Sequence, residues 1–192
     1  MSELAAILLA GGRGSRMGGV NKPLLEVGGT TLLDAAIAAA REAGCDPIVA
    51  VGDPIAGADA RREVTWVRED PPYGGPAAAI LAALPRVAAS RVLVLACDLP
   101  EVKAAVRLLL EIPFDGDGSC LADEAGRLQW LVGIYRADAL RSAGAALPQA
   151  GQGASVRALL GGLNLTAVAA SDDLAADIDT WDDLNQARRR NP

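Results

Sequence analysis

The sequence predicts a three-layer α/β/α domain with a mostly parallel central sheet. Residues 4–9 and 91–96 are short, largely apolar runs that end at polar loops, which is typical of buried parallel strands. Residues 31–43 carry helical periodicity, and Gly44 supplies the stop signal. Strands that alternate with helices indicate a parallel sheet covered by helices on both faces.

The other elements follow from the same patterns. Short apolar runs predict strands at 47–51, 64–67 and 163–168, and two strands within 117–135 around an Ala-Gly turn at 125–126. Periodicity and breakers predict helices at 76–84, 101–111, 137–147 and 154–160. Thr180 is the expected cap of a last helix, with Asp183 at its third position. Without an internal repeat or a long linker, residues 1–192 are expected to form one domain.

Composition removes several kinds of chemistry. The 192 residues include no histidine, which excludes Ser-His-Asp catalysis and histidine-bound zinc. The three cysteines lack a CxxC spacing and are expected in the core of a protein from a reducing compartment. The net charge of −6 argues against binding to nucleic acid or to a membrane surface. No apolar run suits a membrane span or a signal peptide, so a cytoplasmic location is expected.

Three polar loops follow predicted parallel strands. They are residues 10–23, 68–76 and 97–100. Ligands of such sheets bind at the carboxyl ends of the strands, so these loops are expected to meet at one rim. With histidine absent, the groups available for catalysis in these loops are carboxylates, Arg, Lys, backbone amides and a hard metal ion.

The first loop has the composition of a phosphate-binding loop. It reads LAGGRGSRMGGVNKP over residues 9–23, and its glycines allow backbone amides to approach phosphate oxygens. Lys22 is one of only two lysines in the chain. A P-loop is excluded because no Gly-Lys-Ser/Thr follows, and a dinucleotide fingerprint is excluded because Met17 occupies its third glycine position. A solvated glycine turn remains the simpler alternative.

The pattern LAGG-x-x-x-RMGG-x-x-KPLL resembles the sugar-nucleotidyltransferase-like superfamily, and within it most closely the molybdenum cofactor guanylyltransferases. The resemblance implies a single Rossmann-like domain in which the first loop holds the guanine nucleotide. The nucleotide-binding residues expected from it are Leu9, Ala10, Gly11, Gly12, Arg13, Gly14, Ser15 and Lys22. Arg16 and Lys22 are the expected catalytic residues, because their charges can follow the phosphates through the transition state.

Two later segments extend the resemblance. Asp70 and Gly75 occupy the family's second nucleotide segment, although a solvated acidic residue before a helix explains Asp70 equally simply. Asp98 ends a predicted buried strand, where a carboxylate is costly unless it is paired or bound to metal. The resemblance implies that Asp98 binds Mg²⁺ and contacts the nucleotide, and that Asp179 is a second metal ligand. A role in helix capping alone is the alternative for both residues.

The sequence also departs from the family. The family often has an Asn that contacts the nucleotide near the end of the second strand, where this chain reads VAVGDP over residues 49–54. Gln129-Trp130 replaces a common His-Pro, and Asp179 replaces an Asn. The expected reaction is transfer of GMP from GTP to the phosphate of molybdopterin, with Mg²⁺ as cofactor and pyrophosphate as product, in a monomer or weak oligomer. Alternatives are a cytidylyltransferase acting on molybdopterin or another small phosphate, and an inactive nucleotide-binding partner protein.

Overall fold

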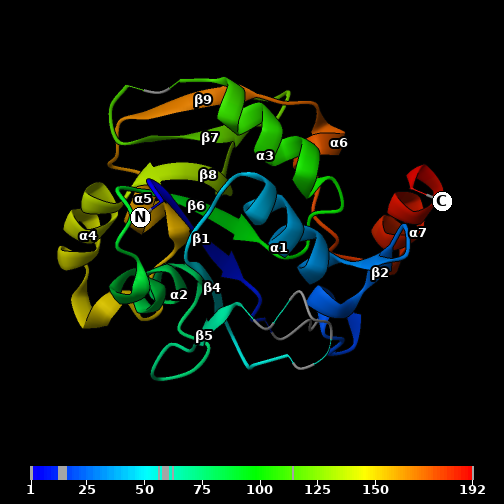
Figure 1. Cartoon of the computed structure of the whole chain (residues 1–192), viewed down its shortest axis with the longest axis horizontal. Helices are drawn as coiled ribbons and strands as arrows, with labels where there is room; N and C mark the ends of the chain where they lie inside the picture. The colour runs from blue at the N-terminus through cyan, green and yellow to red at the C-terminus, as the bar shows by residue number, and fades with distance from the viewer. Residues whose placement is uncertain are drawn as a thin grey trace.

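A seven-stranded sheet forms the centre of the molecule (Figure 1). The computed structural model describes residues 2–12, 17–55, 57, 61, 63–113 and 115–191. The strand order is β5-β4-β1-β6-β8-β7-β9. The strands are β1 (Leu4–Leu9), β4 (Ile48–Val51), β5 (Thr65–Val67), β6 (Arg91–Ala96), β7 (Gly118–Ala122), β8 (Leu128–Arg136) and β9 (Leu165–Ala169).

Four of the six strand pairings in this sheet are parallel. The antiparallel pairings belong to β8, which lies between β6 and β7 and pairs with both. β7 and β8 pair antiparallel because they are joined by the short turn at 123–127. Strands joined by such a short connection cannot pair in the parallel sense, which needs a longer crossover. β9 then pairs with β7 in the parallel sense. The predicted mostly parallel sheet is confirmed.

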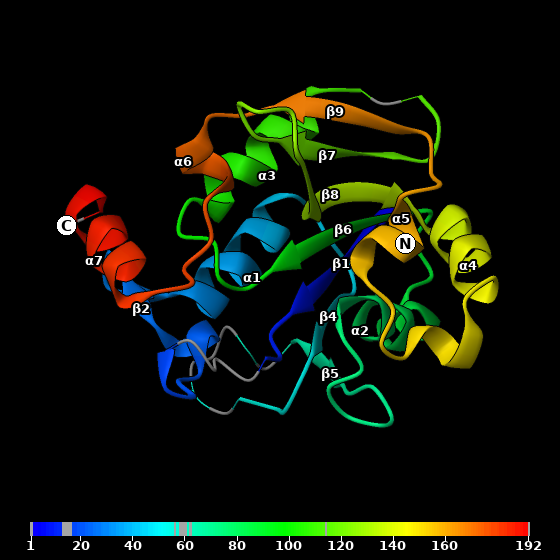
Figure 2. The same cartoon turned by 180° about the vertical axis from the view of Figure 1, so that it is seen from behind.

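Helices cover both faces of the sheet (Figures 1 and 2). They are α1 (Leu32–Glu42), α2 (Pro76–Ala83), α3 (Val102–Glu111), α4 (Ala137–Ala145), α5 (Val156–Leu160), α6 (Asp172–Ala175) and α7 (Trp181–Arg190). Alternate residues of β1 point to opposite faces. Ala6 and Leu8 belong to the apolar cluster that contains the buried faces of α1 and α3, whereas Ala5 and Ile7 pack with α2, α4 and α5.

A third apolar cluster lies beside the sheet and joins the two ends of the sequence. Met17, Leu25 and Leu32 pack there against Ile178 and Leu184. The chain reaches this cluster through the 3-10 helix η2 (Lys22–Leu24) and a small hairpin of β2 (Glu26–Val27) and β3 (Thr30–Thr31). In both views α7 lies next to β2, at the end of the molecule opposite α4 (Figures 1 and 2). The cluster therefore fixes the part of the glycine loop after residue 16 against the segment that precedes α7.

The strands and helices expected from the sequence are present, with boundaries that differ by a few residues. The exceptions are the β2–β3 hairpin and α6, which the patterns did not predict. Gly28 and Gly29 adopt φ values of 56° and 72° in the hairpin turn, a conformation that favours glycine. The three cysteines are buried, as expected. None of the described helices is long and apolar enough to cross a membrane.

Candidate active site

The glycine loop begins where β1 ends, at the rim formed by the carboxyl ends of the parallel strands. Ala10 continues the strand by donating a backbone hydrogen bond to Val51 O (3.0 Å), and Gly11 and Gly12 are exposed beyond it. Arg13, Gly14, Ser15 and Arg16 lie outside the described residues, so their expected contacts remain predictions. The exposed backbone at Gly11 and Gly12 leaves room for a ligand.

Gly52, at the end of β4, packs against this loop. A Cβ atom at Gly52 would lie 3.1 Å from Gly11 N and 3.2 Å from Ala10 C, and the residue has φ +144°. Both the backbone conformation and the close approach require glycine. A side chain at this position would therefore displace the glycine loop.

Lys22 is the first residue of η2, and Pro23 beside it is buried in the protein. The backbone is held by Leu25 N, which donates to Lys22 O (2.9 Å). The ammonium nitrogen Nζ lies 2.6 Å from Asp179 Oδ1 and 3.8 Å from Asp98 Oδ2. One cation thus contacts two carboxylates that come from distant parts of the sequence.

Asp98 follows β6 and is largely buried. Cys97 N donates to Leu9 O (3.2 Å), so the chain is still aligned with β1 at this point. Asp98 Oδ1 is buried and has no hydrogen-bond partner in the described part of the chain. Burial, together with the negative charges of Asp177 and Asp179, raises the pKa of Asp98 to about 6 despite the attraction of Lys22. An orphaned carboxylate oxygen in such a place is a candidate ligand for a cation.

Asp179 is brought to Asp98 by the backbone of its neighbour. Ile178 N donates to Asp98 O (2.9 Å), and the Ile178 side chain is buried in the third apolar cluster. Asp179 N and Thr180 N both donate to Asp183 Oδ2, at 3.1 and 2.7 Å. Thr180 and Asp183 form the capping box of α7, as the sequence predicted. The cap therefore also fixes the backbone that carries Asp179.

These residues fit a divalent cation that is shared with a phosphate ligand. No group of three or more His, Cys, Asp or Glu side chains suited to a metal occurs among the residues that the structure describes. The two carboxylates at Lys22 and the unpartnered Asp98 Oδ1 provide a smaller donor set. Hard cations such as Mg²⁺ are often held by one or two carboxylates, with phosphate oxygens and water as the other ligands.

Two adjoining cavities open at this rim. The larger has a volume of about 580 Å³, and its walls include Leu9, Gly11, Gly12, Gly75 and Asp98. The smaller, about 230 Å³, is lined by Ala10, Gly11, Gly12 and residues of the loops after β4 and β5. We call the two together the nucleotide cavity. Six residues predicted from the sequence therefore line these two cavities, and Asp98, which lines the larger one, also contacts Lys22.

Asp70 is placed differently. Its side chain is exposed, and it is not among the residues that line the nucleotide cavity. Glu69 and Tyr73 line both parts of the cavity, and neither was predicted from the sequence. The signal that was available for Tyr73 is compositional, because an aromatic side chain in a Pro- and Gly-rich loop is conspicuous in a chain with only 3% aromatic residues.

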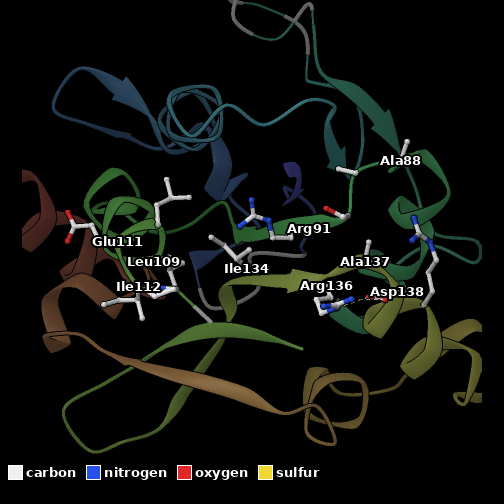
Figure 3. A pocket seen from close by; sticks show the side chains of 14 residues that line it. Ala88, Arg91, Leu109, Glu111, Ile112, Ile134, Arg136, Ala137 and Asp138 are labelled. Atoms are coloured by element: carbon white, nitrogen blue, oxygen red, sulfur yellow. Dashed lines mark hydrogen bonds and ion pairs between the residues drawn. The ribbon is translucent and has the colours of Figure 1, made fainter. Parts of the chain in front are cut away.

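Another cavity, of about 720 Å³, lies at the opposite end of β6 (Figure 3). Arg91 and Arg136, which are register partners on β6 and β8, contribute to its wall. Each arginine already has an acidic partner: Arg91 Nη2 lies 3.3 Å from Glu3 Oε2, and Arg136 Nε lies 3.3 Å from Asp138 Oδ1. The dashed line in Figure 3 marks the second pair. This cavity lies far along the strand from Asp98, so it is separate from the site at the rim.

The glycine loop follows the first strand, Lys22 lies between two carboxylates, and a cavity adjoins them at the carboxyl ends of the parallel strands. This arrangement is that of an α/β nucleotide-binding domain of the nucleotidyltransferase class. Comparison with known proteins gives the family. The sequence profile described as "MobA-like NTP transferase domain" matches residues 6–172. The chain belongs to this family, which confirms the resemblance that its glycine loop indicated.

Relatives and solved structures agree with this membership. A molybdenum cofactor guanylyltransferase from Acidiphilium cryptum is 36% identical over 147 residues, covering 72% of this chain and 71% of that protein. One from Pseudomonas syringae pv. tomato is 37% identical over 110 residues, covering 57% of this chain and 55% of that protein. The alignment thus spans about half the length of the Pseudomonas protein. The structure of a nucleotidyl transferase from Methanothermobacter superposes with a TM-score of 0.75 at 26% identity, covering 98% of this chain and 97% of that one.

Proposed function

We propose that this protein transfers GMP from GTP to the terminal phosphate of molybdopterin, with Mg²⁺ as cofactor, and releases pyrophosphate. The observation that carries the proposal is the position of Lys22 between Asp98 and Asp179 at the edge of the nucleotide cavity. Family membership and relatives named molybdenum cofactor guanylyltransferase support the choice of substrates.

The reaction needs no protein nucleophile. An oxygen of the acceptor phosphate, which is already ionised, attacks the α-phosphorus of GTP. A new P–O–P linkage forms, and the bond from the α-phosphorus to the bridging oxygen breaks, so that pyrophosphate leaves with the electron pair. Catalysis then depends on alignment of the two substrates and on neutralisation of the charge that develops on the phosphates.

Lys22 supplies positive charge for these phosphates. Asp179 holds its ammonium group, and the flexible side chain can turn from the carboxylates toward a bound triphosphate. Asp98 and Asp179 would hold Mg²⁺, which when bound supplies Lewis-acid polarisation of the phosphate oxygens. Exposed backbone at Gly11 and Gly12 gives the triphosphate close access to main-chain amides. Arg16 remains a proposed second cation of the loop.

Pyrophosphate release measured with GTP, CTP, ATP and UTP in Mg²⁺, each with and without molybdopterin, tests the proposal. The expected result is release with GTP that requires molybdopterin. Release with CTP instead would make the protein a cytidylyltransferase. Tight GTP binding without turnover on any acceptor would make it a nucleotide-binding partner protein, and either result would overturn the guanylyl-transfer proposal.

The proposal also places the protein in the cytoplasm, where both small charged substrates would be available, as a monomer or weak oligomer. Analytical ultracentrifugation across a range of protein concentrations would measure the oligomeric state, and an obligate dimer would contradict this part.

A further inference from the structure

A segment from the second half of the sequence lies against the turn that precedes α2. The segment is 148–153, which connects α4 to α5 and begins with the 3-10 helix η5 (Pro148–Gly151). In both views the connection between α4 and α5 runs beside α2 (Figures 1 and 2). The structure describes all six of its residues, and none of them lines the nucleotide cavity. An effect of this segment on a bound nucleotide must therefore pass through the residues that it contacts.

Two hydrogen bonds connect the segment to the turn. Gln152 Nε2 donates to Pro71 O (3.0 Å). Gly153 N donates to Gly74 O (2.8 Å). The two accepting carbonyls lie on either side of Tyr73, which lines both parts of the nucleotide cavity. The bonds therefore hold both ends of a stretch that forms part of the cavity wall.

The Gln152 side chain is also packed against the backbone of the turn. A Cβ atom added at Gly74 would lie 2.6 Å from Gln152 Nε2 and 2.7 Å from its Cδ, which is too close for any real contact. Glycine at position 74 leaves the space that the amide group occupies. The amide is therefore fitted to the turn by its shape as well as by its hydrogen bond.

The segment has a strained backbone. Gln149 and Ala150 adopt φ values of 49° and 52°, so two consecutive residues with side chains are in the left-handed region. Gly151 is buried against α2, where a Cβ atom would lie 3.0 Å from Leu81 Cδ1. Gln152 N donates to Gln149 O (3.1 Å) and closes the strained turn. Such strain persists only where surrounding contacts maintain it, and it is found most often close to functional sites.

We propose that Gln152 is a positioning residue for nucleotide binding, an inference that rests on the guanylyl-transfer proposal. Gln152 contacts the turn at Pro71 and Gly74 and holds it in one place, so that this wall of the cavity is formed before the nucleotide arrives. A preformed wall binds a ligand with less loss of conformational freedom than a mobile loop would. Gln152 thus contributes to affinity without touching the nucleotide.

A positioning role and a purely structural role have different consequences. The bond from Gln152 to Pro71 is exposed to solvent, so its loss should change the stability of the fold little. Lys22 and Asp98 are carried by η2 and by the end of β6, so turnover of bound GTP should not depend on Gln152. A positioning role therefore predicts a higher KM for GTP at an unchanged kcat and a nearly unchanged thermal midpoint.

Gln152→Ala in the full chain tests this expectation. Its KM for GTP, and its Kd for GTP by equilibrium dialysis in Mg²⁺ without acceptor, should rise about two- to tenfold, the factor that corresponds to one neutral hydrogen bond. The KM for molybdopterin and kcat should match the parent. Gln149→Ala is the matched control. It removes the same side chain from the same segment, and the exposed Gln149 side chain makes no hydrogen bond among the described residues.

Gly74→Ala tests whether the effect passes through the turn. The new Cβ would displace the Gln152 amide, so this variant should weaken GTP binding by a similar factor. With Gln152→Ala also present there is no amide to displace, so the double variant should bind GTP like Gln152→Ala alone. Factors that multiply in the double variant would show that the two residues act separately, and would overturn the inference.

The inference is also overturned if Gln152→Ala binds GTP like the parent, or if Gln149→Ala weakens binding as much. A lower thermal midpoint with an unchanged KM for GTP would assign Gln152 a structural role only. If the parent transfers GMP while Gln152→Ala shows either of these results, the inference alone fails. A parent that binds no GTP would contradict the proposed function and this inference together.

Discussion

The ammonium nitrogen of Lys22 lies 2.6 Å from Asp179 Oδ1, although 157 positions separate the two residues in the sequence. Lys22 belongs to the glycine loop that follows the first strand, and Asp179 precedes the last helix. The third apolar cluster makes this approach possible, because it packs Met17 of the loop and Leu25, which follows η2, against Ile178 and Leu184. The site is therefore assembled by tertiary packing beside the sheet as well as by the strands themselves.

Lys22→Ala is expected to lower kcat about 100-fold or more, the usual effect of removing one charged contact to a transition state. The matched control is Lys103→Ala, which removes the other lysine of the chain. Lys103 is on the surface, 3.1 Å from Glu42, and should leave kcat unchanged. Steady-state kinetics with GTP checks both variants. A loss of only a few-fold at Lys22 would show that its charge is not used in the transition state.

Asp98→Asn is expected to stabilise the metal-free protein at pH 7. Burial and the neighbouring carboxylates raise the pKa of Asp98 to about 6, so its ionised form is unfavourable in the folded state. Below its unfolded pKa of about 4 the parent carries no such penalty, and its stability then falls as pH rises to about 6. The variant should therefore gain up to about 3 kcal/mol on the parent across this interval.

Urea unfolding in EDTA at pH 4 and pH 7 measures this difference. Asn replaces the protonated carboxyl with nearly the same shape, so the two proteins should have similar stability at pH 4. Adding Mg²⁺ with GTP should stabilise the parent at pH 7 and have a much smaller effect on the variant. Equal stabilisation of both proteins by the metal would exclude Asp98 as its ligand.

Asp183→Ala is expected to affect both stability and metal binding. The Asp183 carboxylate accepts bonds from the backbone of Asp179 and Thr180, so its loss removes a helix cap worth about 1 kcal/mol and releases the backbone that carries Asp179. The Mg²⁺ concentration needed for half-maximal activity should rise several-fold. Asp182→Ala is the control, because this exposed neighbour contributes a similar charge to the first turn of α7 but is not part of the capping box. Similar effects in both variants would assign the result to helix charge alone.

Gly52→Ala is expected to displace the glycine loop. The new Cβ would lie 3.1 Å from Gly11 N, in addition to the strain from φ +144°. Gly126→Ala is the matched control, since Gly126 has φ +76° and open space around it, so that only backbone strain is added. The Gly52 variant should lose more stability than the control and bind GTP at least several-fold more weakly. Unfolding curves and GTP dialysis measure the stability and the GTP affinity of both variants. Equal GTP affinity in the two variants would show that displacement of the loop does not affect nucleotide binding.

Much of the fold was predictable because its signals are local. Residues 4–9 and 91–96 are strands with the expected bounds, and the capping residues Thr180 and Asp183 were identified by their spacing. The β2–β3 hairpin was missed because its strands have only two residues each, too few to show alternation, although Gly28-Gly29 is a known turn signal.

The site was predictable where a residue follows a strand directly. The family resemblance pointed to Leu9, Ala10, Gly11 and Gly12, and Asp98 was singled out because it ends a buried strand; the structure brings all five to the cavities at the rim. Glu69 and Tyr73 were not found, because their placement depends on a loop whose conformation is determined by Arg68 and by distant contacts from Gln152. The roles proposed for Lys22 and Asp179 remain predictions, but their proximity is a consequence of packing that no local pattern encodes.

The bond between Ile178 N and Asp98 O has a consequence for the order in which the protein is made. A growing chain emerges from the ribosome with its glycine loop first and Asp98 later, yet the segment that carries Asp179 follows the last strand of the sheet. A nascent chain can thus pair its first strands while one of the carboxylates at Lys22 is still missing. The contact between Lys22 and Asp179 can form only after the segment around Ile178 has been made, so a chain that stops before this segment lacks one side of the site.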